Sequence, residues 1–483
     1  MKRRKRWYLG WGLFGCIVAA IILHVQGGNR PALEPWHTER LSAEFSIEKG
    51  GEIQNFGDYR QLEDRLFAQL AENVYARTGT GSGYEIVRYS SGSAADPQQR
   101  NPNWNRSFEL PCNSPVGGVL LLHGMSDSPY SLRALGEALN QRNYWIVGPR
   151  LPGHGTAPSA LKRIHWEDMA AVVRLGIEHL ASKVGPKPIH IIGYSTGAPL
   201  ALDYTLDALE GKSSPVPASL VLISPAIGIH PMAKLAALKN GLSLVPGLGR
   251  LAWVSIQPEF DPYKYNSFAT NAGAQVHRVT SSVARRISAW SRSGPLNTFP
   301  PTLVFKSTVD ATVSTTAVVD RLLKRLGPHG HELVLFDINR LAANATLLVS
   351  DPGPLAARLM ADEALPFTVT VVANENPESF QVFTRRKAPF SSAASETASL
   401  NLAWPPGVIS LSHVALPFPP NDPLYGRRPP DNADVLFLGQ MAIQGERGLL
   451  KIPYDWLLRL RHNPFYDFLE TQALAWVDSA NEP

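Results

Sequence analysis

A serine between two glycines is the residue of this sequence best placed to act as a nucleophile. It is Ser195, in the segment GYSTG (residues 193–197), which follows the apolar run IHII and precedes a helix-like run. A strand that turns sharply into a helix here would expose the hydroxyl, and the glycines would allow close approach. The helix start would add N–H groups and a favourable dipole. The pattern predicts attack on a carbonyl; the alternative is an ordinary serine turn.

Attack on a carbonyl also needs donors for the oxyanion that forms. The apolar run GGVLLL leads into His123, Gly124 and Met125. In a strand-turn-helix site of this kind, one backbone N–H comes from such an upstream loop and the other from the residue after the nucleophile. We therefore predict the backbone N–H groups of Met125 and Thr196 as donors, and we interpret His123 as a structural residue that braces the loop.

An acidic residue follows a later apolar run. Asp310 comes after TLVFKST and before the helix-like TTAVVDRLLKRL. A carboxylate in that loop can accept the imidazole N–H of a histidine, fix its tautomer and stabilise the imidazolium. The alternative is a carboxylate that caps the following helix. Asp320 lies within the helix and is a poorer candidate.

The general base must be a histidine beyond Asp310 if the chain order is serine, acid, histidine. The candidates are His329, His331, His413 and His462. The first two precede the apolar run ELVLF, at the wrong end of a strand, and the last sits beside a basic helix, in a surface or packing position. His413 follows the β-like run GVISLS and opens a proline-rich loop, where the carboxyl ends of parallel strands meet. We predict His413 as the base; the alternative is a structural loop histidine.

The elements that must position these residues begin at about Val116. From there apolar strands alternate with amphipathic helices, which predicts a mostly parallel central sheet with helices on both faces. Upstream, residues 58–77 have helical spacing and YEIVRYS (84–90) has the pattern of a strand. Residues 227–294 interrupt the alternation with a largely apolar segment that suits a cap or lid, or that packs on the core. A second insert, 339–406, contains two strand-like runs.

The expected organisation has five parts. They are an N-terminal signal-anchor helix (1–26), a linker and N-terminal extension with the first strands (27–115), the first part of the core (116–226), the cap insert (227–294) and the second part of the core (295–483), which contains the insert 339–406.

Composition excludes several classes of function. The chain has 483 residues, 44% hydrophobic and 18% charged, which suits a loop-rich globular protein. Five of its 46 basic residues lie at 2–6, and the others equal the 41 acidic residues in number, so no basic surface for nucleic acid is indicated. No glycine-rich phosphate-binding loop or His/Cys metal cluster is present in either insert, and we expect no cofactor and no metal. The two cysteines indicate no disulfide framework.

The N-terminus has the pattern of a membrane anchor. Residues 7–26 contain no Asp, Glu, Lys or Arg, and 20 helical residues span about 30 Å, the thickness of a bilayer core. The preceding basic cluster would stay cytoplasmic. We expect a single-pass protein of the inner membrane with its catalytic domain on the periplasmic side. A cleaved signal peptide and a buried helix are the alternatives.

Several segments together resemble a known family. LLLHGMSDSPYSLRAL, RLPGHGTAPS, IIGYSTG and STVDATV are similar, in order and spacing, to α/β-hydrolases of the group with monoacylglycerol lipases, carboxylesterases and serine aminopeptidase-like hydrolases. The likeness is specific over residues 117–325, and SLSHVALPFPPNDPLYG resembles the histidine segment of membrane-anchored bacterial members. The resemblance implies a Ser195–His413–Asp310 triad, with Met125 and Thr196 forming the oxyanion hole. The N-terminal extension and the insert after Asp310 depart from the family pattern.

These features predict a serine hydrolase that cleaves carboxylic esters through an acyl-enzyme. A lipid or acylglycerol-like ester is the expected substrate, because the anchor would hold the site near a bilayer. A peptidase or amidase, or a thioesterase, would use the same triad, and a non-catalytic binding protein is a further alternative. The expected partners are a small acyl ester and the membrane; no partner protein is evident.

Overall fold

The computed structural model describes residues 31–228, 249–310, 313–328, 330–343, 348, 350–431, 436–439 and 459–481. The predicted anchor at 7–26 and most of the apolar part of the cap insert lie outside these ranges. Within them, no helix combines the length and the apolar character needed to cross a bilayer.

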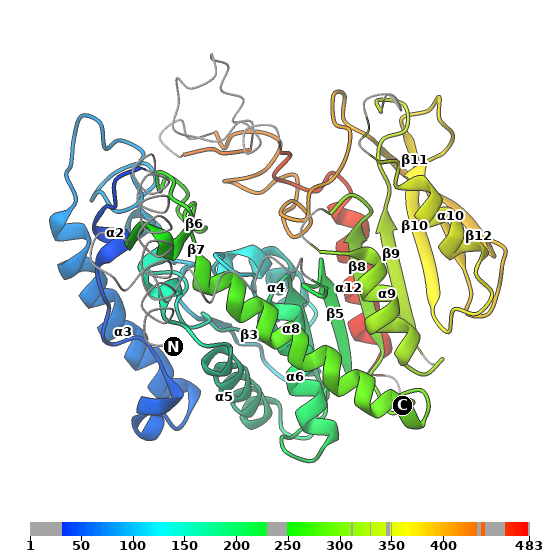
Figure 1. Ribbon diagram of the computed structural model, residues 1–483, viewed down its shortest axis with the longest axis horizontal. Helices are drawn as coiled ribbons and strands as arrows, with labels where there is room; N and C mark the ends of the chain where they lie inside the picture. The colour runs from blue at the N-terminus through cyan, green and yellow to red at the C-terminus, as the bar shows by residue number, and fades with distance from the viewer. Residues whose placement is uncertain are drawn as a thin grey trace, which may run out of the picture.

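A ten-stranded sheet forms the centre of the molecule (Figure 1), in the order β1-β3-β2-β4-β5-β8-β9-β10-β11-β12. The seven strands from β3 to β10 in this spatial order run parallel to one another. The edge strand β1 pairs antiparallel with β3, and β11 and β12 form antiparallel pairs at the other edge. The predicted α/β-hydrolase fold is thus confirmed. The strands are β1 (Phe108–Leu110), β2 (Gly117–Leu122), β3 (Tyr144–Gly148), β4 (Ile189–Tyr194), β5 (Ser219–Ile223), β8 (Thr302–Ser307), β9 (His331–Phe336), β10 (Thr368–Asn374), β11 (Gln381–Lys387) and β12 (Glu396–Ala403).

Helices cover both faces of this sheet. One face carries α5, α6, α8 and α9, and the other carries α4 and α12. The helices are α2 (Pro35–Thr38), α3 (Phe56–Asn73), α4 (Arg133–Asn140), α5 (Trp166–Val184), α6 (Gly197–Leu209), α8 (Thr270–Trp290), α9 (Thr315–Arg321), α10 (Gly353–Ala361) and α12 (Tyr466–Ser479).

The strand sequences explain the two layers. In β2, Leu120 and Leu122 belong to the hydrophobic cluster under α5 and α6, whereas Val119 and Leu121 belong to the cluster under α4 and α12. Successive side chains of a strand point to opposite faces, so a strand that is buried on both sides must be apolar at every position. This is why the run GGVLLL shows no alternation of apolar and polar residues.

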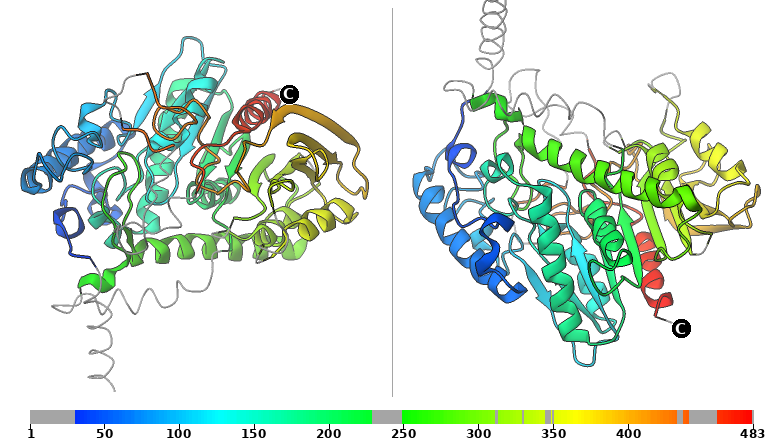
Figure 2. Two further views of the ribbon diagram at one scale, coloured as in Figure 1. Left: turned by 90° about the horizontal axis from the view of Figure 1, so that it is seen from above. Right: turned by 60° about the horizontal axis from the view of Figure 1, so that its bottom comes forward.

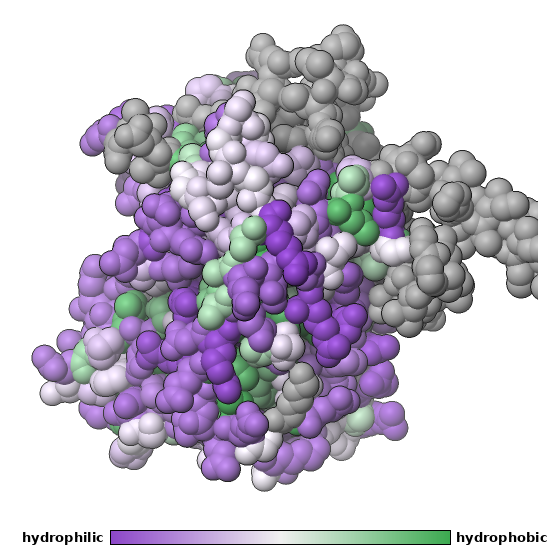
Figure 3. Space-filling model, turned by 90° about the vertical axis from the view of Figure 1, so that its left-hand side faces the viewer, coloured by the Kyte–Doolittle hydropathy of each residue, from purple (hydrophilic) through white to green (hydrophobic). Residues whose placement is uncertain are grey.

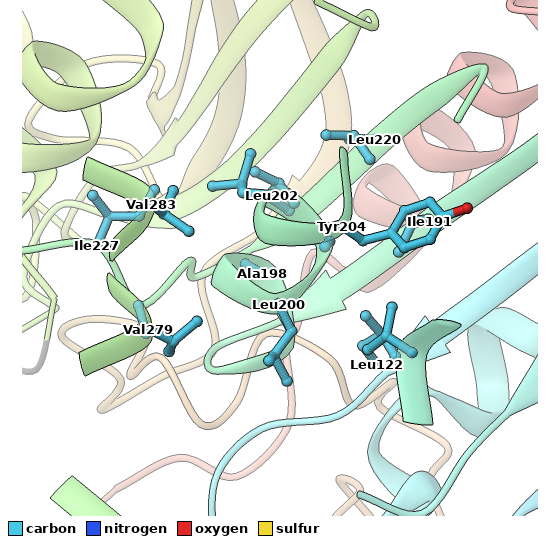
Figure 4. Packing of buried hydrophobic residues seen from close by; sticks show 14 of the residues in the cluster. Leu122, Ile191, Ala198, Leu200, Leu202, Tyr204, Leu220, Ile227, Val279 and Val283 are labelled. Atoms are coloured by element: carbon cyan, nitrogen blue, oxygen red, sulfur yellow. The ribbon is translucent and has the colours of Figure 1, made fainter. Parts of the chain in front are cut away.

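The described part of the first insert packs against the core. It contains a short antiparallel pair, β6 (Trp253–Ser255) and β7 (Phe268–Ala269), followed by α8. Val279 and Val283 of α8 lie against α6 in the main hydrophobic cluster (Figure 4). Figure 2 shows α8 as one long helix that runs from the β6–β7 side of the molecule toward α9. For α8, the structure therefore agrees with the alternative that this insert packs on the core.

The second insert extends the sheet. Its two strand-like runs form β10 and β11, and β12 completes a hairpin that projects at one end of the sheet (Figure 1). The β-like run at 407–412, by contrast, forms no strand. It is a loop that crosses the strand ends and is held there by Asn339. The Asn339 backbone N–H donates to the Ile409 carbonyl (2.7 Å), and its side-chain amide donates to the Val408 carbonyl (2.9 Å).

The N-terminal extension packs along the side of the core as α2 and α3, and the face shown in Figure 3 is predominantly hydrophilic. The strand expected at YEIVRYS is absent; the segment forms turns. Arg88 in its centre is buried and donates its backbone N–H to Glu259 (2.8 Å) and a guanidinium N–H to Asn105 (3.0 Å). These contacts to distant segments replace the strand pairing.

Gly197 begins α6 where this helix crosses β2. A Cβ atom there would collide with the carbonyl oxygen of Leu122. We expect Gly197→Ala to lower the free energy of unfolding by about 1–3 kcal/mol, the usual cost of overpacking. Urea denaturation measures this loss. Gly273→Ala in α8, where a Cβ meets only ordinary contacts, is the control and should be neutral or stabilising; equal effects of the two variants would contradict the steric argument.

Candidate functional site

Ser195 lies at the turn between β4 and α6, in the backbone conformation that the motif predicts. Its φ angle is +51°, a left-handed conformation that is costly for a residue with a side chain. Its N–H donates to the Ile223 carbonyl (2.9 Å) and its own carbonyl accepts from Ala226 (3.0 Å). A Cβ at Gly193 would collide with the α6 backbone, so both glycines of the motif are sterically required. Ser195 remains half-buried, while its two neighbours are buried.

The loop after β2 lies directly against this turn. A Cβ built on Gly124 would come within 3.1 Å of the Ser195 Cβ. His123 Nδ1 is 2.9 Å from the Gly124 carbonyl, and its Nε2 accepts from the Leu151 N–H (3.0 Å). Burial, the largest cause, holds the pKa of His123 well below its usual value. The neutral imidazole is thus engaged at both nitrogens, as expected for a residue that braces the loop.

The two predicted oxyanion donors lie in this region. Met125 follows Gly124 in the loop, and Thr196 precedes the first residue of α6. Neither N–H takes part in the turn, loop and cap hydrogen bonds between described residues. Both groups are therefore available as donors beside Ser195.

Asp310 lies in the loop after β8, two strands from β4 in the sheet. Its carboxylate is fully buried; Oδ2 accepts from Lys306 Nζ at 2.8 Å, and Oδ1 accepts from the Val313 N–H at 3.1 Å. Lys306 itself is fully buried, and burial lowers its pKa. The lysine fixes one carboxylate oxygen, while the other faces a histidine.

That histidine is His413, whose Nδ1 is 3.7 Å from Asp310 Oδ1. Its loop is tied to the ends of two strands: Ser307 Oγ donates to the Leu411 carbonyl (2.7 Å), and the Tyr194 hydroxyl donates to the His413 carbonyl (3.5 Å). Figure 1 shows this loop, in orange, crossing next to the ends of β5 and β8. The structure thus brings the base candidate to the edge that carries Ser195 and Asp310.

Burial also determines the charge of His413. Burial lowers the pKa of the imidazole to about 4. The Asp310 carboxylate raises this pKa, whereas the positive charges of Lys264, Arg459 and Lys306 lower it further. The ring is therefore neutral at pH 7, the form that can accept a proton.

Of the other histidine candidates, His331 is clearly placed away from Ser195. His331 is the first residue of β9 and is opposite Thr302, the first residue of β8, so it lies at the amino end of the strands, away from Ser195. His462 is buried, and burial lowers the pKa of its imidazole. A hydrogen bond with the Tyr425 backbone acts in the opposite direction and raises this pKa. His329 lies outside the described residues.

Two charged residues that sequence reasoning missed complete the site. Asp127, just after the Gly124 loop, pairs with Lys264 of the first insert at 3.0 Å, and both side chains are largely buried. Burial raises the pKa of Asp127 to about 6, and Lys264 opposes this shift. The neighbouring Tyr265 donates its N–H to the Ser126 carbonyl (2.8 Å). The insert thereby clamps the loop, and no local motif marks these residues.

Within the part of the chain that the structure describes, no group of three His, Cys, Asp or Glu side chains is placed to hold a metal ion. The chemistry available at the edge is that of a hydroxyl, a neutral imidazole, a buried carboxylate and backbone N–H donors.

Comparisons with known proteins point to one family. Residues 119–358 match the model described as "Alpha/beta hydrolase family". The chain is 29% identical over 175 residues to a thermostable monoacylglycerol lipase of Bacillus sp. strain H-257, covering 36% of this chain and 66% of that protein. It is 39% identical over 90 residues to a carboxylesterase of Bacillus subtilis, covering 18% and 36%. In both cases the chain spans less than two thirds of the relative's length.

Among solved structures, the chain is similar to a monoacylglycerol lipase of Paleococcus ferrophilus. The identity is 17% and the TM-score is 0.37, and the alignment covers 48% of this chain and 88% of that one.

Proposed function

We propose that this protein hydrolyses carboxylic esters with Ser195 as nucleophile, His413 as general base and Asp310 as the acid that orients it. The match of residues 119–358 to the alpha/beta hydrolase family model supports this proposal. The observation that carries the proposal is the placement of His413. Its loop is bound to the ends of β4 and β8, the two strands that lead into Ser195 and Asp310. The curated relatives, a monoacylglycerol lipase and a carboxylesterase, support ester cleavage.

In the first step, Ser195 Oγ attacks the ester carbonyl and His413 takes its proton. The ester bond to the alcohol breaks when the imidazolium returns this proton to the leaving oxygen, which leaves an acyl group on Ser195. Water then attacks the acyl-enzyme, again with His413 as base. The bond between the acyl group and Ser195 Oγ breaks as the imidazolium returns the proton to Oγ, which releases the carboxylic acid and restores the serine. The buried Asp310 carboxylate stabilises the imidazolium in both halves, and Lys306 holds that carboxylate in place.

The tetrahedral oxyanion of both halves is stabilised by the N–H groups of Met125 and Thr196. Backbone donors fixed before the reaction stabilise developing charge without reorganisation, and removal of one such donor in comparable enzymes costs about 2.7–4 kcal/mol. The positive end of α6 adds to this stabilisation. The clamp between Asp127 and Lys264 keeps the Gly124–Ser126 loop in position.

The pH dependence of ester hydrolysis tests the state of His413. A protonated imidazole accepts no proton, so activity is lost as the pH falls through the pKa of the free enzyme's base. Since that pKa is about 4, kcat/KM should rise through pH 4 and stay level to neutral pH. The measurement is a pH–rate profile on a soluble ester, with recovery of activity at pH 7 as the control for unfolding. A midpoint at the ordinary histidine pKa of 6.5 would contradict this assignment.

The reaction class is tested by comparing leaving groups. We expect hydrolysis of p-nitrophenyl esters of graded acyl length, labelling of Ser195 by a fluorophosphonate probe, and little cleavage of aminoacyl amides. A lipid or acylglycerol-like ester is the proposed natural substrate, in line with the monoacylglycerol lipase relative. If amides were cleaved faster than matched esters, the assigned reaction class would change from esterase to peptidase. If thioesters were cleaved faster, it would change to thioesterase. If Ser195 is not labelled and no substrate is turned over, the remaining interpretation is a non-catalytic binding protein.

We also propose that residues 7–26 anchor the protein in the inner membrane, with the site on the periplasmic side. The support is the uncharged run after five basic residues. Cell fractionation of the full chain, compared with a chain that lacks residues 1–26, tests it: the full chain should stay with membranes after a salt wash. Release of the full chain by salt alone would contradict anchoring.

A further inference from the structure

A small cavity beside His413 has an unusual lining. Its volume is about 60 Å³, enough for a few water molecules or for one group the size of a carboxylate or a phosphate. Three cations and three apolar or aromatic side chains surround it: Lys264, Arg459, Arg461, Val414, Phe418 and Tyr425.

The carboxylates near this cavity leave its positive charge only partly neutralised. Asp127 pairs with Lys264 (3.0 Å), and Asp261 pairs with Arg461 (3.4 Å). Asp261 also accepts a hydrogen bond from the Tyr425 hydroxyl at 2.6 Å. No carboxylate among the described residues forms an ion pair with Arg459. Among the described residues, three cations thus face two carboxylates, which leaves one positive charge in excess.

One wall of the cavity is formed by the chain neighbour of the proposed base. Val414, in its wall, is the residue after His413, and the charges of Lys264 and Arg459 both act on the imidazole and lower its pKa. Lys264 also contacts Asp127, which follows the loop that lies against Ser195. A group bound in the cavity would therefore lie beside the site at which an ester is proposed to react.

We propose that this cavity binds a carboxylate or phosphate group of the substrate, so that the preferred ester carries one negative charge in addition to the scissile ester group. The inference rests on the proposed ester hydrolysis and adds a substrate class to it. Guanidinium and ammonium groups bind such oxyanions with charge-assisted hydrogen bonds. The Lys264 and Arg461 side chains are largely buried, which strengthens their attraction for an anion because the surrounding dielectric is low. Arg459 is exposed and can approach the anion from the solvent side. The Phe418 and Tyr425 rings provide apolar walls for the adjoining carbon chain.

Two matched pairs of esters test the proposal, one for each side of the scissile bond. On the acyl side, p-nitrophenyl hydrogen suberate is compared with its methyl ester. On the alcohol side, the methyl phosphodiester of monodecanoylglycerol is compared with monodecanoylglycerol itself. We expect the charged member of at least one pair to have a kcat/KM about tenfold higher, mainly through a lower KM, as a charge-assisted contact provides.

Charge variants connect the preference to the cavity. Arg459→Gln should reduce the ratio between charged and neutral esters to near one while hydrolysis of the neutral ester persists, and Arg459→Lys should restore most of the ratio. Arg292→Gln removes an exposed arginine of the α8 end and is the matched control. A wild-type protein that favours the neutral member of both pairs overturns the proposal, as does a ratio unchanged by Arg459→Gln and by Lys264→Met.

Binding without turnover separates this proposal from the proposed function. Octyl phosphate and octanol are titrated against Ser195→Ala protein by calorimetry, and again with Arg459→Gln added. Tighter binding of octyl phosphate that weakens about tenfold with Arg459→Gln supports the anion site even if no ester is hydrolysed; in that case only the esterase assignment fails. Equal binding of the two ligands overturns the anion site and leaves the esterase assignment intact.

Discussion

Replacement of Ser195 by alanine is expected to reduce ester hydrolysis by about four to six orders of magnitude in kcat. In the proposed mechanism the hydroxyl oxygen of Ser195 forms the acyl-enzyme, and no other group at this edge of the sheet is proposed to take its place. The residue sits at φ +51° between glycines that the helix crossing requires, so an alanine there keeps the shape of the turn. The loss should therefore appear in kcat and not in the stability of the protein.

The measurement is steady-state turnover of a p-nitrophenyl ester, combined with fluorophosphonate labelling of wild type and variant. Ser182→Ala, which removes an exposed hydroxyl from the end of α5, is the matched control and should retain full activity and labelling. Circular dichroism and urea denaturation show whether Ser195→Ala is folded. Turnover within tenfold of wild type in a folded Ser195→Ala protein would falsify the covalent mechanism.

His413→Ala is expected to reduce kcat by about four orders of magnitude, because the proposed mechanism uses this residue as base and acid in both halves of the reaction. Its carbonyl is bound by Tyr194 and its loop by Ser307, contacts that do not use the imidazole. Removal of the ring should thus leave the loop in place. Labelling by fluorophosphonate should slow as well, since Ser195 loses its base.

His331 offers the decisive comparison, because it follows Asp310 in the chain but lies at the opposite end of the strands. His331→Gln should retain activity within a few-fold of wild type, even if its burial makes the protein less stable. Assays at a temperature where both variants are folded separate the two effects. Activity lost with His331→Gln and kept with His413→Ala would transfer the role of base and overturn the proposed triad.

The two glycines and Ser195 illustrate what a local pattern can predict. The strand, the turn and the start of α6 lie within a few consecutive residues, so their spacing predicts a sharp turn. The close contacts that a Cβ atom would make at Gly193 and Gly197 confirm this turn. The same holds for the uniformly apolar strands, whose burial on both faces follows from composition. In these cases the residues that interact are neighbours in the chain or share one repeating pattern.

Local patterns failed where a distant partner outweighs local preference. The segment YEIVRYS has the composition of a strand, yet Arg88 at its centre is buried against Glu259 and Asn105. The run at 407–412 is apolar like a strand but is held as a loop by Asn339. β-propensity reflects packing against neighbouring segments, and these neighbours come from other parts of the chain.

The sequence by itself determined the fold class, the nucleophile candidate and the edge of the sheet at which it lies, because these depend on short-range spacing and on the direction of parallel strands. The sequence also favoured His413 over His331, but only the tertiary structure shows how close His413 comes to Asp310, and that Lys264, Asp127 and Lys306 lie around these residues and Ser195. Ion pairs between segments far apart in the chain leave no periodic signal. Their geometry exists only once the loops have folded over the strand ends.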